Sequence, residues 1–363
     1  MKKSERMWAF GVWLALIAAL ATVFALDVGG LQTFMTTSFG MSPKDGGNMV
    51  LAMALAPFPF DPVLAAIVVA YRNAKAIADA VLPRVLVGRQ TFEYNKYDRR
   101  ETFTIPNTLV GRKGTPDQVE FSATKAEASC DGHGLDDYVP QDDIDNAPAG
   151  YNPVNIAVEG IAELLTLSRE KRAADLVFSA DTYGASNKVQ LSGNHQWSVV
   201  HADSNPIPDI NTGLDACVLR PNVMVIGAAA WVGLRTNAYI MKAINRTSGD
   251  SGMAKREEIA ELFELDEVLV GMSLYNTAKK GQTASLSRLW GKHCSLIYRD
   301  KSVQDPRGKV TFGLTAQWGP KVAGTIPEPK VGLKGSTLVR AGEYIKELVS
   351  ANDLGYFIQD CVS

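Results

Sequence analysis

Residues 84 to about 130 are predicted to form a long β-ribbon that has little hydrophobic core of its own. Large apolar residues alternate with polar neighbours along the ribbon, and they are Phe92, Tyr94, Phe103, Ile105, Val119 and Phe121. The stretch "GRKGTP" between them supplies a turn. A two-stranded ribbon is at best marginally stable alone in water, so this one must lie on another surface. A neighbouring subunit is the economical candidate.

The segment before the ribbon, residues 57 to 83, is predicted to be an arm without a core of its own. It reads "PFPFDPVLAAIVVAYRNAKAIADAVLP". The first prolines favour extended backbone, a short helix-capable run follows, and Pro83 ends that run.

The strongest helix signal lies after the ribbon. Asn152 is a good N-cap, Pro153 suits the first turn, and Gly184 is placed to end the element. Apolar residues recur at three- and four-residue spacing, at Val154, Val158, Ile161 and Leu165. The pattern predicts a helix of about 25 to 30 residues, on the order of 40 Å long at about 1.5 Å per residue. Such a helix is a spine rather than an ordinary core helix.

Helical and strand patterns alternate from about residue 203 to 320, which favours an α/β unit. The helical patterns are "DINTGLDACVLR", "AAAWVGLRTNAYIMKAI" and "AKREEIAELFEL", and the strand patterns are "NVMVIG" and "DEVLVG". The single glycine of "VIGAAA" is not a dinucleotide-binding fingerprint. The remainder of the chain is rich in strands, with a short helix expected near its end.

Two segments carry opposite charges. The ribbon holds the basic residues Arg89, Lys96, Arg99, Arg100, Arg112 and Lys113. The following stretch, "DGHGLDDYVPQDDID", holds no Lys or Arg and includes Asp136, Asp137, Asp142, Asp143 and Asp145. Three interpretations stay open: a divalent-cation site, although the glycine and final glutamate of a calcium loop are missing; a solvated acidic face; and a charge match between subunits.

Composition limits the classes of function. A formal net charge of -2 argues against a protein that reads DNA tightly, because phosphate binding needs an excess of Lys and Arg. Cys130, Cys217, Cys294 and Cys361 are single and widely separated, which predicts buried thiols rather than a zinc or redox site. None of these features points to a cofactor, a metal or a small-molecule substrate, and none is expected.

The stretch "GDSG" around Ser251 contains the letters that surround the nucleophile of many serine proteases. A serine nucleophile needs a histidine base, and none of His133, His195, His201 and His293 lies in a setting typical of those enzymes. We interpret Ser251 as a residue at the entry of the helix that follows, with a serine hydrolase as a minor alternative.

Met7 to Leu26 is an uncharged apolar run behind Lys2, Lys3 and Arg6. About 20 apolar residues span a bilayer, so a membrane-anchored extracytoplasmic protein is an alternative. The run is otherwise an accessory helix or an extension that the working protein does not need, since Met35, Met41 and Met49 offer internal starts.

Several of these stretches, in their order and spacing, resemble the major capsid proteins of tailed bacteriophages with the Hong Kong 97 fold. They are the arm and ribbon above, "GLDDYVPQDDIDNAP", the spine helix, "RPNVMVIGAAAWVGLR", "DEVLVG", "NTAKKGQ", "LWGKHCSLIYRD", "FGLTAQWG" and "KELVSANDLGYFIQD". The resemblance starts near residue 57, and residues 1 to 56 depart from it.

The resemblance implies an α+β fold divided into six segments. They are an N-terminal extension (1–56), an N-terminal arm (57–83), an extended loop (84–130), a peripheral domain with the spine helix (131–202), an axial domain (203–320) and a return to the peripheral domain (321–363).

The resemblance also implies a structural protein and no enzyme. Hexamers and pentamers would form an icosahedral shell that encloses double-stranded DNA without reading its sequence. A portal, a scaffold and cement proteins are the expected partners, with assembly in the host cytoplasm. No residue matches a motif for the family's lysine to asparagine cross-link, so no catalysis is expected.

Overall fold

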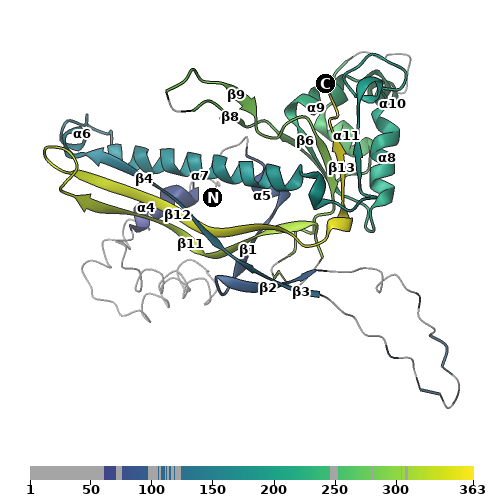
Figure 1. Cartoon of the computed structure of the whole chain (residues 1–363), viewed down its shortest axis with the longest axis horizontal. Helices are drawn as coiled ribbons and strands as arrows, with labels where there is room; N and C mark the ends of the chain where they lie inside the picture. Colours follow the sequence, from purple (N-terminus) through teal and green to yellow (C-terminus); the bar gives the residue numbers. More distant parts are fainter. Residues whose placement is uncertain are drawn as a thin grey trace, which may run out of the picture. The chain divides into compact units, whose positions relative to one another are not determined.

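The structure is a computed structural model of the chain. It describes residues 61–70, 76–96, 124–245, 252–279, 281–303, 305, 306 and 310–363, with isolated positions between 105 and 118. The chain divides into two compact units: the first takes residues 1–73, 130–166 and 317–345, and the second takes residues 74–129, 167–316 and 346–363. Three elements contribute residues to both units: α7 (Pro153–Val177), β11 (Gly313–Glu328) and β12 (Ser336–Val349), all labelled in Figure 1.

The first unit is built on long strands and two helices. β4 (Asp131–Pro140) pairs antiparallel with β12 from Asp131 opposite Ile345 to Pro140 opposite Ser336. The four-stranded sheet has the order β1-β11-β12-β4, so β4 is an edge strand. Helix α4 (Pro62–Ala70) and the first half of α7 bury their apolar residues in one core, and the short helix α6 (Gln141–Asp145) follows β4.

Helix α7 confirms the predicted spine. It has 25 residues, and the Asn152 side chain accepts a hydrogen bond from the Val154 amide at 3.0 Å, as an N-cap should. The helix ends at Val177, before the expected Gly184, because Ser179 accepts a hydrogen bond from the Asp181 amide and starts a separate turn, η1 (Ala180–Thr182).

The second unit contains a five-stranded sheet of order β5-β13-β10-β6-β7. Its strands are β5 (Lys188–Gln190), β6 (Val223–Gly227), β7 (Glu267–Gly271), β10 (Cys294–Ile297) and β13 (Gly355–Gln359). β6 pairs in parallel with β7 and antiparallel with β10. The strands predicted at "NVMVIG" and "DEVLVG" are therefore neighbours in this sheet.

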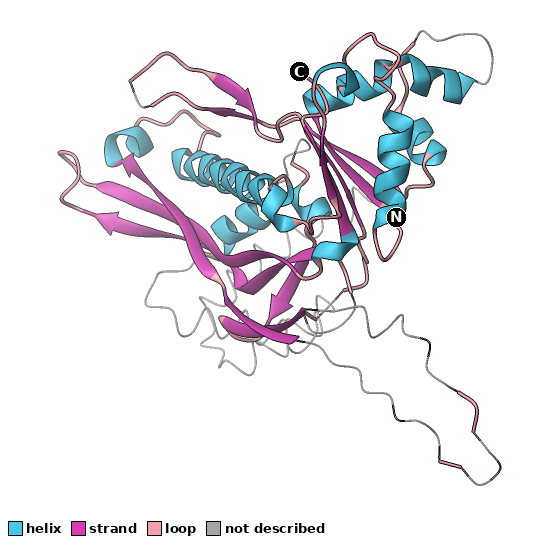
Figure 2. Ribbon diagram, turned by 45° about the vertical axis from the view of Figure 1, so that its right-hand side comes forward, coloured by secondary structure: helices cyan, strands magenta, loops and turns pink. Residues whose placement is uncertain are grey.

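Helices cover both faces of this sheet (Figure 2). Met224 and Ile226 of β6 point into a core shared with α8 (Pro206–Ala216), α9 (Ala228–Thr236), α10 (Ala238–Asn245) and α11 (Arg256–Leu262). Val223 and Val225 point into the opposite core, which includes the second half of α7 and α5 (Ala78–Val81). Successive side chains of a strand point to opposite faces of the sheet, so the apolar residues of β6 are divided between two cores.

Three short strand pairings complete the second unit. β1 (Arg84–Val87) is the neighbour of β11 at one edge of the four-stranded sheet. β2 (Thr91–Lys96) pairs antiparallel with β3 (Thr124–Ser129), and β8 (Leu274–Asn276) pairs antiparallel with β9 (Leu286–Arg288). The short helix expected near the end is the 3-10 turn η3 (Asn352–Leu354).

One expectation differs from the structure. The segment 57–83 was expected to lack a core, but Leu64 and Val68 are buried in the core of the first unit and Leu82 is buried in the second. β5 and β13 come from segments expected in the peripheral domain, yet they share a sheet with β6 of the expected axial domain. β13 finds its partner β10 some sixty residues earlier in the chain, and local sequence patterns do not encode that distance. The division into peripheral and axial domains stays a prediction.

Two sequence expectations concern residues near or beyond the described part of the chain. Ser251 lies outside the described residues, and α11 begins at Arg256 with Lys255 as its N-cap, so the entry residue is not Ser251. The Glu258 carboxylate accepts a hydrogen bond from the Lys255 amide at 2.8 Å. Met7 to Leu26 also lies outside the described residues, and no helix within the described ranges is long and apolar enough to cross a membrane.

Candidate inter-subunit surfaces

The base of the predicted ribbon is the β2–β3 pair, which runs from Thr91 opposite Ser129 to Lys96 opposite Thr124. Phe92 and Tyr94 lie on one face of it with ring centroids 6.5 Å apart. Farther along, Ile105 and Leu109 are 94% and 86% exposed. Large aliphatic side chains with such high exposure are typical of a surface that another molecule covers.

The basic residues of the ribbon are only partly described. Arg89 is exposed between β1 and β2, Lys96 is the last residue of β2, and Arg112 is exposed. Arg99, Arg100 and Lys113 lie outside the described residues. The structure therefore does not test whether these six residues form one basic surface.

The acidic stretch forms the edge strand β4 and helix α6, and all five named aspartates are exposed. Asp136 faces Arg340 across the β4–β12 pair. Two of the guanidinium nitrogens of Arg340, Nε and Nη2, donate to the Asp136 carboxylate at 2.7 Å each. The hydrogen bonds from Arg340 hold the pKa of Asp136 below its ordinary value of 3.8, against a smaller opposing effect of burial.

Lys334, in the turn between β11 and β12, binds two further aspartates. Its ammonium lies 2.8 Å from Asp142 and 3.5 Å from Asp145. The Gln141 side chain also donates to Asp145 at 2.8 Å, and with Lys334 it lowers the pKa of that carboxyl. Asp137 and Asp143 have no ion pair within the described part of the chain.

Sequence reasoning missed Arg340 and Lys334 as partners of the acidic stretch, because each lies about 190 residues or more away in the chain. The strand register supplies the missing information, since it places residue 340 opposite residue 136. Among the described residues, no group of three or more His, Cys, Asp or Glu side chains is arranged to hold a metal ion.

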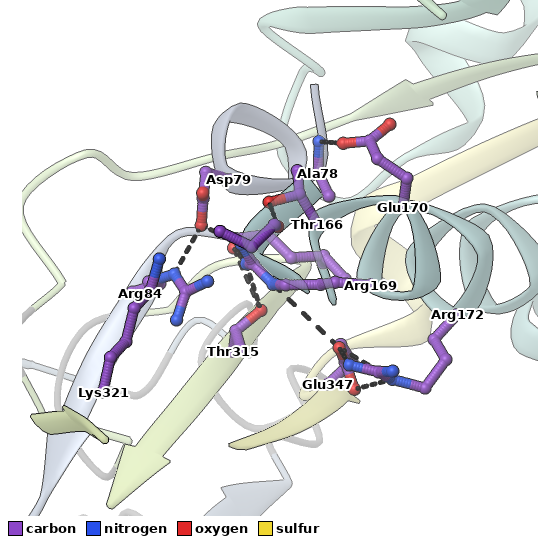
Figure 3. Close-up of polar contacts among 12 residues, drawn as sticks. Ala78, Asp79, Arg84, Thr166, Arg169, Glu170, Arg172, Thr315, Lys321 and Glu347 are labelled. Atoms are coloured by element: carbon purple, nitrogen blue, oxygen red, sulfur yellow. Dashed lines mark hydrogen bonds and ion pairs between the residues drawn. The ribbon is translucent and has the colours of Figure 1, made fainter. Parts of the chain in front are cut away.

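A charge cluster around the buried side chains of Arg169 and Glu170 in the second unit was not anticipated (Figure 3). Arg169 of α7 is almost fully buried and pairs with Asp79, which also accepts a hydrogen bond from Arg84 at 2.7 Å. The Arg169 guanidinium donates to the Leu82 carbonyl at 3.4 Å and to the Thr315 hydroxyl at 3.1 Å. Burial acts to raise the pKa of Asp79, but the two arginines outweigh it and the pKa is lowered.

The next residues of α7 extend this cluster. Arg172 pairs with the Glu347 carboxylate at 3.0 Å. Glu170, 1% exposed, accepts hydrogen bonds from the Ala78 amide at 2.5 Å and from the Trp290 indole nitrogen at 2.6 Å. Burial raises the pKa of Glu170 despite these two donors. The cluster fixes α5, β12 and the Trp290 ring to the second half of α7.

A sequence signal for this cluster existed. Arg169 lies four residues after Leu165, at the next position of the apolar repeat that predicted the spine helix. A charged residue at a core position has to find a buried partner, so it indicates a polar cluster.

All four cysteines are buried, as predicted, and none of them forms a disulfide. Burial raises the pKa of the Cys217 thiol to about 12, and it raises the pKa of Cys294 and Cys361 as well. Such thiols are small apolar core residues rather than nucleophiles.

Comparison with known proteins decides the family. No family model matches the chain. A major capsid protein of Pseudomonas phage JBD67 is 51% identical over 311 residues, which cover 86% of this chain and 100% of that protein. The chain belongs to the major capsid proteins of bacteriophages. The major capsid protein of Burkholderia phage BcepMu is 26% identical over 312 residues, with 82% of this chain and 95% of that protein covered.

Solved structures support the same fold for this capsid protein. A phage-related protein from Bordetella bronchiseptica RB50 is similar with a TM-score of 0.66 at 20% identity, over 84% of this chain and 98% of that chain. A prophage protein of E. coli CFT073 has a TM-score of 0.50 at 12% identity, over 84% and 99% of the two chains. The fold is of the Hong Kong 97 type and the class is α+β, as predicted.

Membership of this family gives the chain a structural, shell-forming role, in the capsid of the virion. It is a structural family and not one of enzymes. The homologues do not support the membrane-anchored protein or the serine hydrolase that the sequence left as alternatives.

Proposed function

We propose that this capsid protein forms the hexamers and pentamers of an icosahedral shell that encloses a phage genome. The observation that carries the proposal is the 51% identity to a phage major capsid protein over that protein's whole length. The ribbon supports it, because the described positions Ile105 and Leu109 are open in the single chain. A net charge of -2 fits a shell that holds double-stranded DNA without reading its sequence.

Sedimentation and electron microscopy of the expressed protein test this proposal. We expect rings or closed shells, alone or with a co-expressed scaffold. A well-folded monomer under all these conditions, with the ribbon resistant to protease, would contradict it.

Assembly in the host cytoplasm, with a scaffold, around a portal and with cement proteins on the surface, belongs to the same proposal. A chain that starts at Met49 should still assemble, since the resemblance to capsid proteins starts only near residue 57. Loss of particles from that shorter chain, with its fold intact, would make residues 1 to 48 part of the assembly machinery.

The basic ribbon of one subunit is proposed to lie over the acidic stretch of its neighbour. Arg89, Lys96, Arg99, Arg100, Arg112 and Lys113 are the basic residues of this contact. Within the chain, Asp136 is bound by Arg340 and Asp142 and Asp145 by Lys334. The acidic residues best placed to accept a neighbour's ribbon are therefore Asp137 and Asp143.

Charge reversal tests the contact. Arg99 and Arg100 changed together to Glu should abolish assembly at low salt while the unfolding midpoint of the subunit stays nearly constant, because exposed pairs contribute only about 0.2 to 1 kcal/mol each to folding. Asp137→Lys with Asp143→Lys should restore particles.

A matched control reverses two exposed lysines outside the ribbon, Lys242 and Lys301, and should assemble normally. Normal assembly of the Arg99 and Arg100 variant at low salt would refute the contact and leave Asp137 and Asp143 as a solvated face.

A further inference from the structure

The β8–β9 hairpin of the second unit has one covered face and one open face. Leu274 lies opposite Arg288, Tyr275 opposite Ser287, and Asn276 opposite Leu286. Since opposite residues share a face, Leu274 and Leu286 lie on one face and Tyr275 lies on the other. Tyr275 is half-buried, and the Lys171 ammonium of α7 lies 5.8 Å from its ring centroid.

The open face of the hairpin carries Leu274 and Leu286 together with Asn276 and Arg288. Leu286 is 66% exposed, and Leu274 and Met272 are also exposed. Met272 precedes β8, which begins at Leu274, so of these three side chains the strand alternation places only Leu274 and Leu286 on this face. A two-stranded sheet with its apolar face in water is at best marginally stable, so a partner that covers this face would stabilise the hairpin.

The hairpin is also basic. Residues 272 to 292 contain Lys279, Lys280, Arg288 and Lys292 and no Asp or Glu. Lys292 pairs with Asp360 of its own chain at 3.7 Å. Lys279 and Arg288 are exposed, and neither has an ion pair with another described residue. The partner of the open face should therefore be apolar and acidic.

The first half of α7 has that composition on its exposed side. Ile156, Gly160 and Leu164 follow one another at four-residue spacing, and all three are exposed, with Leu164 at 56%. Residues four apart share a helix face, so these three form an apolar row with a shallow step at Gly160. A Cβ added at Gly160 would meet no atom within 4 Å.

An acidic row runs beside the apolar row. Glu159 and Glu163 are exposed, and neither has an ion pair with a described residue. Residues 153 to 168 contain these two glutamates and no Lys or Arg. The apolar row and the acidic row together are called the α7 stripe.

We propose that the β8–β9 hairpin of one copy packs its open face on the α7 stripe of a second copy. The occupant is a second copy because both surfaces expose apolar side chains in the single chain and because their charges are opposite, basic on the hairpin and acidic on the α7 stripe. Leu274 and Leu286 would lie along the row from Ile156 to Leu164, with Lys279 and Arg288 beside Glu159 and Glu163. This contact rests on the proposed function, since it is one of the contacts that join subunits in the shell.

Two single-cysteine chains test the contact in assembled particles. Leu286→Cys and Leu164→Cys chains, one of them carrying an affinity tag, are co-assembled and oxidised, and a non-reducing gel separates the products. The four native cysteines are buried, so the background of surface disulfides should be low. We expect a dimer that contains one chain of each kind. The matched control pairs Leu286→Cys with Val232→Cys on α9, which is also exposed, and should give no such dimer.

The outcomes separate this contact from shell assembly itself. Particles that form but give no more mixed dimer than the Val232→Cys control would overturn the contact and leave the shell intact. A disulfide within one chain that carries both cysteines, in place of the mixed dimer, would overturn it as well. Failure of the unsubstituted chain to form particles would instead overturn the proposed function.

A charge swap gives a second measurement that needs no disulfide. Glu159→Lys with Glu163→Lys should lower the assembled fraction about tenfold at low salt, since repulsion replaces attraction across the contact. Lys279→Glu with Arg288→Glu in the same chain should restore the fraction. Assembly that is unchanged by the first pair, or that the second pair lowers further, would contradict the proposal.

Discussion

Two strands of this capsid protein, β6 and β4, are stabilised in different ways. Every residue of β6 is buried, and the strand sits between β10 and β7 with cores on both of its faces. β4 is twice as long, lies at the edge of its sheet, and buries only Val139. The subunit thus supplies all the partners of β6, whereas much of β4 is open in the single chain.

The sequences of the two strands reflect this difference. "VMVIG" is apolar throughout, as expected of a strand that is buried on both faces. "DGHGLDDYVP" places charged residues among exposed Leu135 and Tyr138. Charges on an edge strand limit indiscriminate pairing and leave only partners of matching charge. Substitutions in β6 should therefore affect the folding of the subunit, and substitutions in β4 should affect assembly.

The largest effect should come from Gly271→Ala, at the end of β7 beside β6. A Cβ at Gly271 would lie 2.1 Å from Cγ of Trp290, whose ring is fully buried. The ring has no room to move, so we expect a loss of about 3 to 5 kcal/mol of unfolding free energy, or failure to fold. Urea denaturation followed by circular dichroism measures it.

Gly88→Ala is the matched control, because a Cβ at Gly88 would meet no atom within 4 Å. Equal stability of the two variants would contradict the account of a core packed tightly around β6 and β7.

The second effect compares the two strands directly. Ile226→Ala removes a buried side chain from β6 and should cost about 2 to 5 kcal/mol, whereas Leu135→Ala on β4 should stay within about 0.5 kcal/mol in the isolated subunit. The unfolding midpoints of the two variants measure the difference. In particles the difference in stability between the two variants should narrow, because a neighbour that covers β4 makes Leu135 part of an interface. A β4 variant as unstable as the β6 variant in the monomer would refute the comparison.

The features predicted correctly from the sequence are those with a local pattern, and the features missed are those that depend on distant partners. The spine helix and the strands β6 and β7 were predicted because their apolar periodicity is local and is satisfied within a few turns or residues. The burial of Leu64 and Leu82 was missed, because a short helix-capable run does not reveal which distant surface it packs on.

The acidic surface shows the same limit. Its residues were identified, but their partner Arg340 follows from the β4–β12 register, which is set by pairing and not by local pattern, and Lys334 lies in the turn that leads into β12. The hairpin face is a similar case, since "SLYN" and "SLSR" acquire a common surface only when β8 and β9 pair and place Leu274 and Leu286 on the same face.

The third effect concerns a buried carboxylate, Glu170, in the core that packs on Val223 and Val225 of β6. Glu170→Gln should cost about 1 to 3 kcal/mol, because one of its two short hydrogen bonds is lost. The folded-state pKa of Glu170 lies above its ordinary value of 4.5, so its contribution to stability is fully present below pH 4.5 and is lost as the pH rises through the folded-state pKa.

The stability difference between the unsubstituted chain and Glu170→Gln should therefore shrink as the pH rises from below 4.5. Urea midpoints across that range measure it, with the same substitution at an exposed position, Glu261→Gln, as the control. A difference that grows with pH would show that the carboxylate is stabilised in its charged form.

The smallest effect is expected on β4, where Asp136 and Asp137 are adjacent and exposed but only Asp136 contacts Arg340. Asp136→Asn should cost about 0.2 to 1 kcal/mol, since the pair is bidentate yet open to solvent, and Asp137→Asn should leave the subunit's stability unchanged. The folded-state pKa of Asp136 is lowered, so its contribution is present above pH 3.8 and is lost as the pH falls through the folded-state pKa. Denaturation at neutral pH and at pH 3, at low salt, measures both variants.

In assembly the order of the two effects should reverse: Asp137→Asn should weaken particles more than Asp136→Asn, because Arg340 already binds Asp136 while Asp137 is available to a neighbour's ribbon. If both substitutions affect particles equally, the edge strand acts through its total charge and not through a specific contact at Asp137.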